Sequence, residues 1–547
     1  MCSRMLKPRA EGDRGWEARL IRAIDRVFDW VRRRYERWLK GSLNNLPVTA
    51  TFEVLVLGST YFLSSATGTE LAPQEDQGVI IAFATSAPNA TIDQRQLYAR
   101  QMYEIGTSHP ETDHVFQLDV PGQSITGYVL KPWDKRTMTS NQLQPIIQGE
   151  LAGIAGAQVV AFQPPPLPGS QGLPIQFVIS TTGPFESLNE VAQTFLREAL
   201  ATGRFIFLNT DLKIDSPQAT VVIDRDKASH LGLKMSDIGA AMGSMLGGGY
   251  VNYFALDGRS YKVIPQVQQN SRQNIDQILD YHIRAADGSS VALSTVAKIV
   301  TKAIPQSLNH FQQLNSATIQ GVAFPGVSQA EALQTLQELA ARTLPQGYSV
   351  DYGGASRQYI QESGGFIVTF AFALVIIYLS LAALFESFRD PLIILFSVPM
   401  SIAGALVFLM ALSTVAWPGA TLNIYTQVGL VTLMGLISKH GILIVEVANE
   451  LQTAGKSRRE AIEQAAAIRL RPILMTTGAM VLGVVPLIAA TGAGALSRFS
   501  MGLVIASGLS LGTLFTLFVV PAVYLMLAAD HSKKGEAGEL VDAPAAD

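Results

Sequence analysis

The segment TQVGLVTLMGLISKHGILIVEVANE, residues 426–450, decides the fold class, because it is a long apolar run with a lysine inside it. A helix that spans a bilayer needs about 20 mostly apolar residues, and residues 426–447 meet that requirement. Lys439 stands roughly 20 Å along such a helix at a rise of 1.5 Å per residue. A lysine at that depth costs about 2.5–3.5 kcal/mol on insertion scales. The segment therefore predicts a membrane helix that carries a functional lysine.

Two structural explanations compete with a functional role for Lys439. Its side chain could extend to the aqueous surface, since two or three helical turns remain before the span ends. Alternatively, His440 or Glu446 could satisfy it locally, although Glu446 stands seven residues further along the helix, too far for a close pair. We favour a functional role with a partner outside this helix.

Five other segments have the length and apolar composition of membrane spans. They comprise residues 48–65, 366–385, 391–412, 472–489 and 501–528. The whole chain is 48% hydrophobic and only 16% charged, whereas soluble domains average about 25% charged residues. The sequence therefore predicts a protein with six transmembrane helices.

The placement of Lys and Arg predicts the orientation of these spans. Residues 1–46, the connection 449–471 and the tail containing Lys533 and Lys534 are basic, whereas residues 413–425 carry no charge. Basic connections remain on the cytoplasmic side. We therefore expect a multi-pass membrane protein with both termini in the cytoplasm. The long segment after the first span would lie outside, which is the periplasm if the cell is Gram-negative, where the membrane would be the cell inner membrane.

Residues 16–39 predict an amphipathic helix before the first span. Its apolar residues recur at three- and four-residue intervals opposite an arginine-rich face: Leu20, Ile21, Ile24, Val27, Phe28, Val31, Tyr35 and Leu39. Such a helix is expected to lie in the interface of the lipid bilayer, with its basic side chains near anionic lipid. An ordinary amphipathic helix packed on soluble protein is the alternative.

The segment of about 300 residues between the first two spans has the composition of a soluble region. Alternating strand and helix patterns predict an α+β, ferredoxin-like βαββαβ unit in residues 73–174. A second unit begins at 175–216 and resumes at 309–355, with an insert at 217–308 that includes a helix near residues 235–246. A hairpin is expected at YFALDGRSYKVI, with Asp257-Gly258 at its turn. The two units and the insert together predict a binding cleft with a docking surface.

Several kinds of chemistry are disfavoured by the residues. Cys2 is the only cysteine, and the seven histidines have no metal-ligand spacing. We find no nucleophile–base or phosphate-loop pattern, so we expect no enzyme, no cofactor and no nucleic-acid partner. Met235, Met242 and Met245 could suggest a soft-metal relay, but their helical context favours packing.

The acids of the predicted spans are too few for a proton-coupled transporter. The acids there are Glu53 and Glu446, both near span ends. Either the relay acid comes from another polypeptide or the chain does not pump. Arg469 and Thr476 are seven residues apart and thus share a helix face, whereas Arg471 fits the positive-inside rule. Transporters built from two repeated halves place their coupling site between the halves, and this chain is typical of one half.

Long motifs in this chain resemble one known family. They are PQEDQGVI at 73–80, YHIRAADGSSVAL at 281–293, LSLAALFESF at 379–388, RLRPILMTTGAMVLGVVPL at 469–487 and the opening segment. Over essentially the whole chain they resemble the carboxy-terminal half of resistance-nodulation-division permeases, which export hydrophobic and amphiphilic compounds.

The resemblance implies a fold, partners and site residues. It implies a trimeric, twelve-span proton/drug antiporter that works with a periplasmic adaptor and an outer-membrane channel. The ferredoxin-like units would be porter subdomains, and residues 217–308 would be the docking domain. Lys439 matches the relay lysine, which pairs with aspartates of the amino-terminal half. Arg469 and Thr476 match accessory relay positions.

The resemblance also sets the expected boundaries and leaves alternatives. Residues 1–46 would form the cytoplasmic interfacial helix, 47–66 the first span, 360–529 the other five spans, and 530–547 a cytoplasmic tail. Residues 119–133 are short where drug pumps often carry a glycine-rich loop. The alternatives are an exporter of lipid or metal, or a non-transporting remnant without the relay aspartates.

Overall fold

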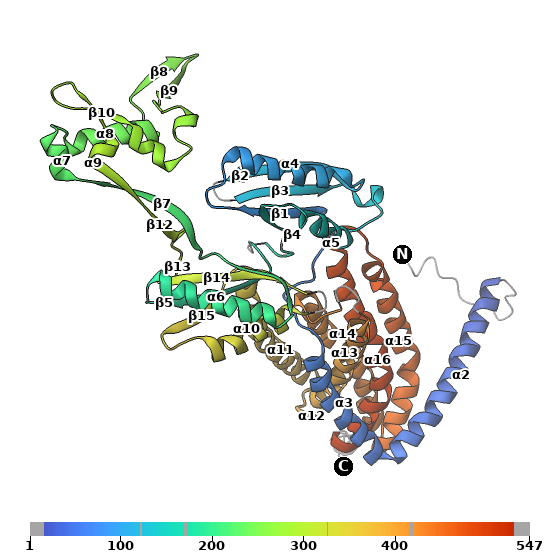
Figure 1. Ribbon diagram of the computed structural model, residues 1–547. Coiled ribbons are helices and arrows are strands. Elements are labelled where there is room, and N and C mark those ends of the chain that lie inside the picture. The colour runs from blue at the N-terminus through green and yellow to red at the C-terminus, as the bar shows by residue number, and fades with distance from the viewer. Residues whose placement is uncertain (1–15, 121–122, 169–171, 325–326, 416–419, 530–547) are drawn as a thin grey trace, which may run out of the picture.

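A computed structural model describes residues 16–120, 123–168, 172–324, 327–415 and 420–529, without the side chains of residues 16–22 and Ser363. A bundle of long helices forms one end of the molecule, and two sheets with their helices lie beyond it (Figure 1). The predicted tail with Lys533 and Lys534 falls outside the described residues.

Six helical segments among the described residues are long and apolar enough to cross a membrane. They are α3 (Leu46–Ala66), α11 (Gly354–Phe385), the pair α12 (Arg389–Leu395) and α13 (Ser397–Thr414), α14 (Ile424–Thr453), α15 (Arg458–Ile488) and α16 (Ala495–Leu527). Each of the six apolar runs of the sequence falls on one of them to within one residue. Hydropathy thus located these helices, but it did not locate their ends.

The start of α15 was predicted wrongly. The sequence pattern placed Pro472 in its first turn, yet α15 begins at Arg458 and Pro472 lies inside it. Ser457 caps the helix by accepting a hydrogen bond from the Glu460 amide. The basic connection is therefore mostly helix. This segment has a buried apolar side that includes Ile462 and Leu470. Its charged residues lower the mean hydropathy, so the predicted span began too late.

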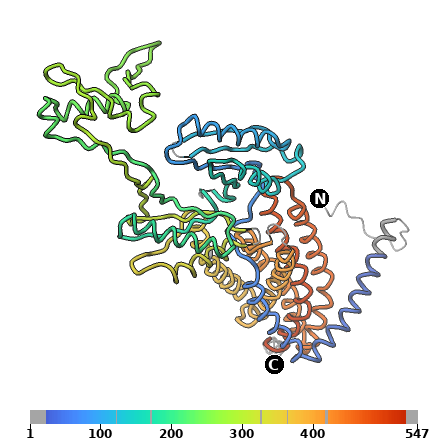
Figure 2. Tube along the Cα trace, viewed as in Figure 1, coloured from blue at the N-terminus to red at the C-terminus, as the bar shows by residue number. Residues whose placement is uncertain are grey.

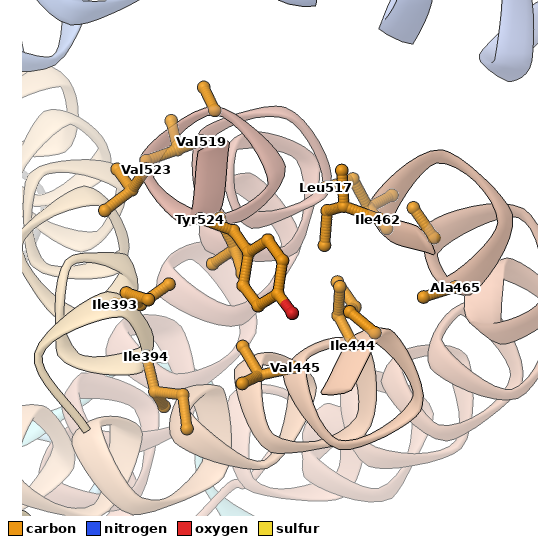
Figure 3. Packing of buried hydrophobic residues seen from close by; sticks show 14 of the residues in the cluster. Ile393, Ile394, Ile444, Val445, Ile462, Ala465, Leu517, Val519, Val523 and Tyr524 are labelled. Atoms are coloured by element: carbon orange, nitrogen blue, oxygen red, sulfur yellow. The ribbon is translucent and has the colours of Figure 1, made fainter. Parts of the chain in front are cut away.

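Helix α16 lies at the centre of the bundle and packs against α13, α14 and α15. Its glycines permit that approach, because a Cβ on Gly508 would stand 2.2 Å from Leu433 and one on Gly512 would stand 2.5 Å from Ser401. Figure 3 shows the apolar packing, in which the Tyr524 ring lies among side chains of neighbouring helices. The bundle is therefore close-packed around α16.

The first sheet has the strand order β2-β3-β1-β4, with all neighbours antiparallel. Its strands and helices are β1 (Val79–Ser86), α4 (Ile92–Ser108), β2 (Thr112–Val120), β3 (Gln123–Leu130), α5 (Ser140–Leu151) and β4 (Ala157–Phe162). Tyr128, Leu143 and Ile147 are fully buried between the sheet and its helices.

The second sheet repeats this arrangement with strand order β6-β14-β5-β15. It is built from β5 (Ile175–Thr181), α6 (Phe185–Ala201), β6 (Phe205–Thr210), β14 (Leu314–Ala323), α10 (Gln329–Thr343) and β15 (Tyr348–Tyr352), and the short β13 (His310–Phe311) pairs with β14. Phe177 and Phe195 stack in its core, with ring centroids 5.4 Å apart. Half of this unit comes from each side of the insert.

A two-stranded ribbon of β7 (Ile214–Ile223) and β12 (Ala297–Pro305) leads out to the inserted unit, which stands apart from the rest of the molecule (Figure 2). That unit contains α7 (Arg225–His230), α8 (Met235–Leu246), the hairpin β8 (Asn252–Leu256) and β9 (Arg259–Val263), η2 (Gln269–Ser271), η3 (Ile275–Asp280), β10 (His282–Arg284), β11 (Ser290–Ala292) and α9 (Leu293–Val296). The helix at 235–246 and the hairpin are confirmed. Asp257 and Gly258 have φ values of 49° and 72°, as a tight hairpin turn requires.

The amphipathic helix is also confirmed as α2 (Trp16–Asn44), which ends two residues before α3 begins. Tyr35 and Leu39 are buried against the bundle, and the Tyr35 hydroxyl donates to the Leu517 carbonyl at 2.7 Å. Arg471 of α15 pairs with Asp25 of α2 at 3.0 Å. Arg471 therefore has a structural partner in α2, which agrees with the structural role preferred for it over a functional one.

Candidate functional site

Lys439 lies on α14 with its side chain exposed on the outside of the bundle. Within the part of the chain that the structure describes, it makes no hydrogen bond or ion pair. Neither Glu446 nor His440 satisfies the Lys439 ammonium. Glu446 is exposed without a contact to Lys439, and the His440 ring contacts Thr477 instead. An exposed, unpaired ammonium on a helix long enough to span a membrane requires a partner outside this chain or water.

His440, the residue after Lys439, is fully buried and joins three helices. Its Nε2 lies 3.3 Å from the hydroxyl of Thr477 on α15, and its Nδ1 lies 3.4 Å from the hydroxyl of Thr513 on α16. The two threonine hydroxyls are 3.2 Å apart. Sequence reasoning missed this cluster, because a histidine inside a span does not reveal which helices face it.

Arg469 and Thr476 are both half-buried on α15. Thr476 donates to the Ile473 carbonyl at 3.0 Å, and the Nε atom of Arg469 is buried with no hydrogen-bond partner among the described residues. Since His440 contacts Thr477, their chain neighbours Lys439 and Thr476 lie at the same level of the bundle. Within the described ranges, no hydrogen bond or ion pair joins Lys439 to Arg469 or Thr476, so any relay among them needs further groups.

The structure adds a buried acid to those expected from the sequence. Asp390 begins α12, belongs to a segment that qualifies as a span, and is 1% exposed. Its Oδ2 accepts from the Asn449 side chain at 3.2 Å, while its Oδ1 has no hydrogen-bond partner among the described residues. The Tyr524 hydroxyl donates to Asn449 at 2.6 Å and accepts from Gln452 at 2.6 Å. Asp390 lies one residue before the apolar run 391–412, so the sequence pattern did not include it among the acids of the spans.

The two other acids expected in the spans differ from each other. Glu53 is buried on α3, and its Oε1 lacks a hydrogen-bond partner within the described ranges. Glu446 is exposed on α14. Neither acid contacts Lys439. Among the described residues, the fold therefore does not bring Lys439 together with these acids.

A cleft of about 610 Å³ lies between the two sheets. Its lining combines apolar side chains with amides: Phe83, Val160, Leu173, Phe207, Gln123, Gln158, Asn209, Gln306 and Gln320 are among them. Apolar walls with a few convergent polar groups are typical of sites for small molecules. The cleft thus suits a compound that has both an apolar body and hydrogen-bonding groups.

Two charged residues line the cleft, and their states differ. Asp211 accepts from the Thr318 amide at 2.6 Å and from the Asn309 side chain at 2.9 Å. Burial raises the pKa of Asp211, although these hydrogen bonds act in the opposite direction. Lys213 is half-buried, and its ammonium has no partner in the described part of the chain. The charge available to a ligand is therefore positive.

A model of the AcrB/AcrD/AcrF family matches residues 1–528. The chain is 41% identical over 538 residues to an uncharacterized transporter of Haemophilus influenzae, covering 97% of this chain and 52% of that protein. It is 30% identical to the multidrug/solvent efflux pump membrane transporter MepB of Pseudomonas putida over 98% of this chain and 52% of that protein.

A more distant relative is the multidrug resistance protein MdtF of Escherichia coli K12, at 28% identity over 96% of this chain and 52% of that protein. The chain therefore spans about half the length of these curated relatives.

Proposed function

The chain belongs to the AcrB/AcrD/AcrF family of transporters, and on that premise we propose that it forms half of a proton/drug antiporter of the inner membrane. The observation that carries the proposal is Lys439, an exposed ammonium that has no partner among the residues described, on a helix long enough to span the bilayer. A second membrane half that presents carboxylates to this face would supply that partner.

In the proposed mechanism, Lys439 pairs with deprotonated acids of the other half, next to Arg469 and Thr476. Protonation of those acids removes their charge and releases Lys439, because a neutral carboxyl no longer holds an ammonium. The helices then shift relative to each other. The buried contacts of His440 to Thr477 and Thr513 transmit this shift from α14 to α15 and α16.

The exported compounds would occupy the cleft between the two sheets, whose volume of about 610 Å³ lies in the range of small-molecule sites. Phe83 and Phe207 would contact the apolar part, and the amides of Gln158 and Gln320 would bind polar groups. We propose amphiphilic compounds as the substrate class on this mixed lining.

The assembly around the chain is part of the proposal. The family resemblance implies a homotrimer, with the amino-terminal half of the permease, a periplasmic adaptor and an outer-membrane channel as partners. Residues 217–308 would be the docking domain, since their unit stands at the end of the β7–β12 ribbon. Residues 73–174, 175–216 and 309–355 would form porter subdomains in the periplasm, with both chain termini in the cytoplasm.

The test is efflux by cells that contain this chain together with an aspartate-bearing partner half. Lys439→Met should abolish energy-dependent export of the fluorescent amphiphile phenylnaphthylamine, while membrane levels of the chain remain unchanged. Lys456→Met, which removes a half-buried lysine in the turn before α15, is the matched control and should export normally. Unchanged export by Lys439→Met would refute the relay role.

A further inference from the structure

The arginine-rich face of α2 is a charged surface that the proposed transport cycle does not use. One line of the helix packs on the bundle through Phe28, Tyr35 and Leu39, spaced seven and four residues apart. Phe28 contacts the Arg471 guanidinium, 5.1 Å from the ring centroid. This line and the Asp25–Arg471 ion pair fix which face of α2 is turned away from the protein.

The outward face carries a regular basic line. Arg26, Trp30, Arg33, Arg37 and Lys40 recur at alternating four- and three-residue intervals, so they share one side of the helix. All five are exposed. Arg37 and Lys40 make no ion pair or hydrogen bond in the described ranges, and Arg33 donates to the Asp29 carbonyl at 3.2 Å, which leaves its charge unneutralised.

Three acids of α2 have described side chains, and none of them forms an ion pair with Arg33, Arg37 or Lys40. Asp25 is paired with Arg471 of α15. Glu36 is paired with Arg32 at 2.9 Å. Asp29 is exposed, and Arg33 contacts its backbone carbonyl. Arg33, Arg37 and Lys40 therefore remain positive charges on the outer face.

Apolar side chains flank the basic line. Val27, Trp30 and Trp38 are 60%, 62% and 56% exposed, values high for such large side chains. Trp38 lies under the Arg34 guanidinium, 5.2 Å from the ring centroid. Tryptophan beside basic residues is typical of the boundary between lipid headgroups and acyl chains.

The position of α2 puts this surface at a membrane boundary. The helix ends at Asn44 and the apolar α3 begins at Leu46. Arg459, in the charged first turn of α15, donates to the Asn44 side chain. Since α3 enters the hydrocarbon directly, the line of cations lies at the level of lipid headgroups.

We propose that the Arg33–Arg37–Lys40 line of α2 binds the phosphate groups of anionic lipids, with Trp30 and Trp38 inserted beside them. The proposal rests on membrane insertion of α3 and requires neither proton coupling nor a second half. Because Trp30 lies in the same line as these charges and Trp38 lies at its flank, a lipid bound there would meet partners for both its headgroup and its upper acyl chain. Neutral lipids would lack the electrostatic attraction.

The test uses the full chain purified in an uncharged detergent and mixed with equal amounts of phosphatidylglycerol and phosphatidylcholine. After size-exclusion chromatography, mass spectrometry measures the ratio of the two lipids that remain bound. The wild-type chain should retain phosphatidylglycerol preferentially. The triple variant Arg33→Gln/Arg37→Gln/Lys40→Gln should lose about tenfold or more of that preference, since each basic side chain near an anionic surface contributes about fivefold.

A matched variant removes three exposed charges from the inserted unit and its ribbon, Arg259→Gln/Lys298→Gln/Lys302→Gln, and should retain the wild-type preference. The thermal midpoint of the α2 variant should match that of the wild type, because none of its three side chains is buried. Equal lipid ratios for the wild-type chain and the α2 variant would overturn the proposal. Displacement of the lipid by inorganic phosphate, beyond that caused by sodium chloride of equal ionic strength, would overturn it by showing a site for free phosphate.

Unchanged export by Lys439→Met, with the lipid preference of the wild-type chain intact, would count against the proposed function alone. Absence of any lipid preference in the wild-type chain, with export that still depends on Lys439, would count against the lipid surface alone. The two proposals therefore fail separately.

Discussion

Glu75 accepts a hydrogen bond from the backbone amide of Ser497 at 2.6 Å, across 422 positions of the chain. The same carboxylate accepts from the Leu496 amide at 3.3 Å and from the Ser497 hydroxyl. These amides belong to the first turn of α16, whose amides have no partner within the helix. Glu75 thus caps the central helix of the bundle from the segment that leads to the first sheet.

The next residue connects this cap to the sheet. Asp76 pairs with the buried Arg136 at 2.8 Å and accepts from the Ser140 amide at the start of α5 at 3.2 Å. Two successive acids therefore tie α16 to α5. A movement of α16 along its axis would be conveyed directly to the first sheet and its helices.

We expect Glu75→Ala to lower the free energy of unfolding by about 1–2 kcal/mol, because it removes a helix cap and a charge that opposes the helix dipole. Export should fall further than this loss of stability explains. Thermal unfolding and efflux are measured in parallel, with Gln77→Ala, which removes a more exposed amide contact, as control. Equal efflux by Glu75→Ala and the control would show that the Glu75 cap does not convey a movement of α16 to the first sheet.

Lys439→Met should change the free energy of unfolding of the isolated chain by no more than about 0.5 kcal/mol, since Lys439 is exposed and has no partner among the described residues. Arg136→Met should cost about 3–5 kcal/mol, because it leaves Asp76 without its buried partner. Thermal unfolding of both variants in the same detergent makes the comparison. A large loss in Lys439→Met would reveal a structural role instead of a relay role.

His440→Ala should lower the free energy of unfolding by about 2–4 kcal/mol, because it opens a cavity and leaves the hydroxyls of Thr477 and Thr513 without the imidazole. Thr513→Val keeps the shape and should cost about 1 kcal/mol. The measurement is the thermal midpoint of each variant. A smaller loss for His440→Ala than for Thr513→Val would contradict the packing assigned to the histidine.

Glu70 gives the chain a pH-dependent stability term outside the membrane helices. Burial raises the pKa of its carboxyl above the ordinary value of 4.5, and the hydrogen bond from Thr421 at 2.5 Å opposes that rise. Because the pKa of the Glu70 carboxyl is higher in the folded chain than in the unfolded chain, its contribution to stability is complete below the unfolded pKa. That contribution is lost as the pH rises through the folded pKa. Glu70→Gln should therefore flatten the decline in thermal midpoint above pH 4.5.

The control for this prediction is Glu362→Gln. Glu362 is an exposed acid that lines the same groove as Glu70. Its midpoint should follow that of the wild-type chain across the same pH range. If the thermal midpoint of Glu70→Gln declined with pH as steeply as that of the wild-type chain, the pH dependence would come from other groups.

Lys213→Met should weaken binding of an anionic amphiphile such as dodecyl sulfate monomer by about tenfold, since it removes the unpaired cation of the cleft. Binding of a neutral amphiphile with the same alkyl chain should be unchanged. Fluorescence displacement below the critical micelle concentration measures both affinities. An equal effect on the two ligands would mean that Lys213 acts through the shape of the cleft.

Periodic features of the chain could be predicted from the sequence. The six apolar helices were located because their length and hydropathy depend on the residues themselves. The repeated strand and helix patterns also matched, and the Asp257-Gly258 turn was found from its residue types. These are local properties, so a single sequence contains them.

The polar contacts inside the bundle could not be predicted in the same way. Asp390 is buried because α12 is covered by neighbouring helices, and Glu75 has its role because α16 begins beside it. Both depend on elements far away in the chain. The late start assigned to α15 has a related cause, since the buried side of its charged first turns becomes apparent only against α2 and α14.

Ile223 and Ala297 face each other in the β7–β12 ribbon, so residues 224–296 leave and re-enter the body of the protein at a single point. The hydrogen bonds recorded for that stretch of the described chain are made within it. A two-residue turn could join the two strands and excise the whole unit, with the sheets and helices beneath it left intact. The unit can therefore be exchanged for another in evolution without any change in the sheets and helices beneath it.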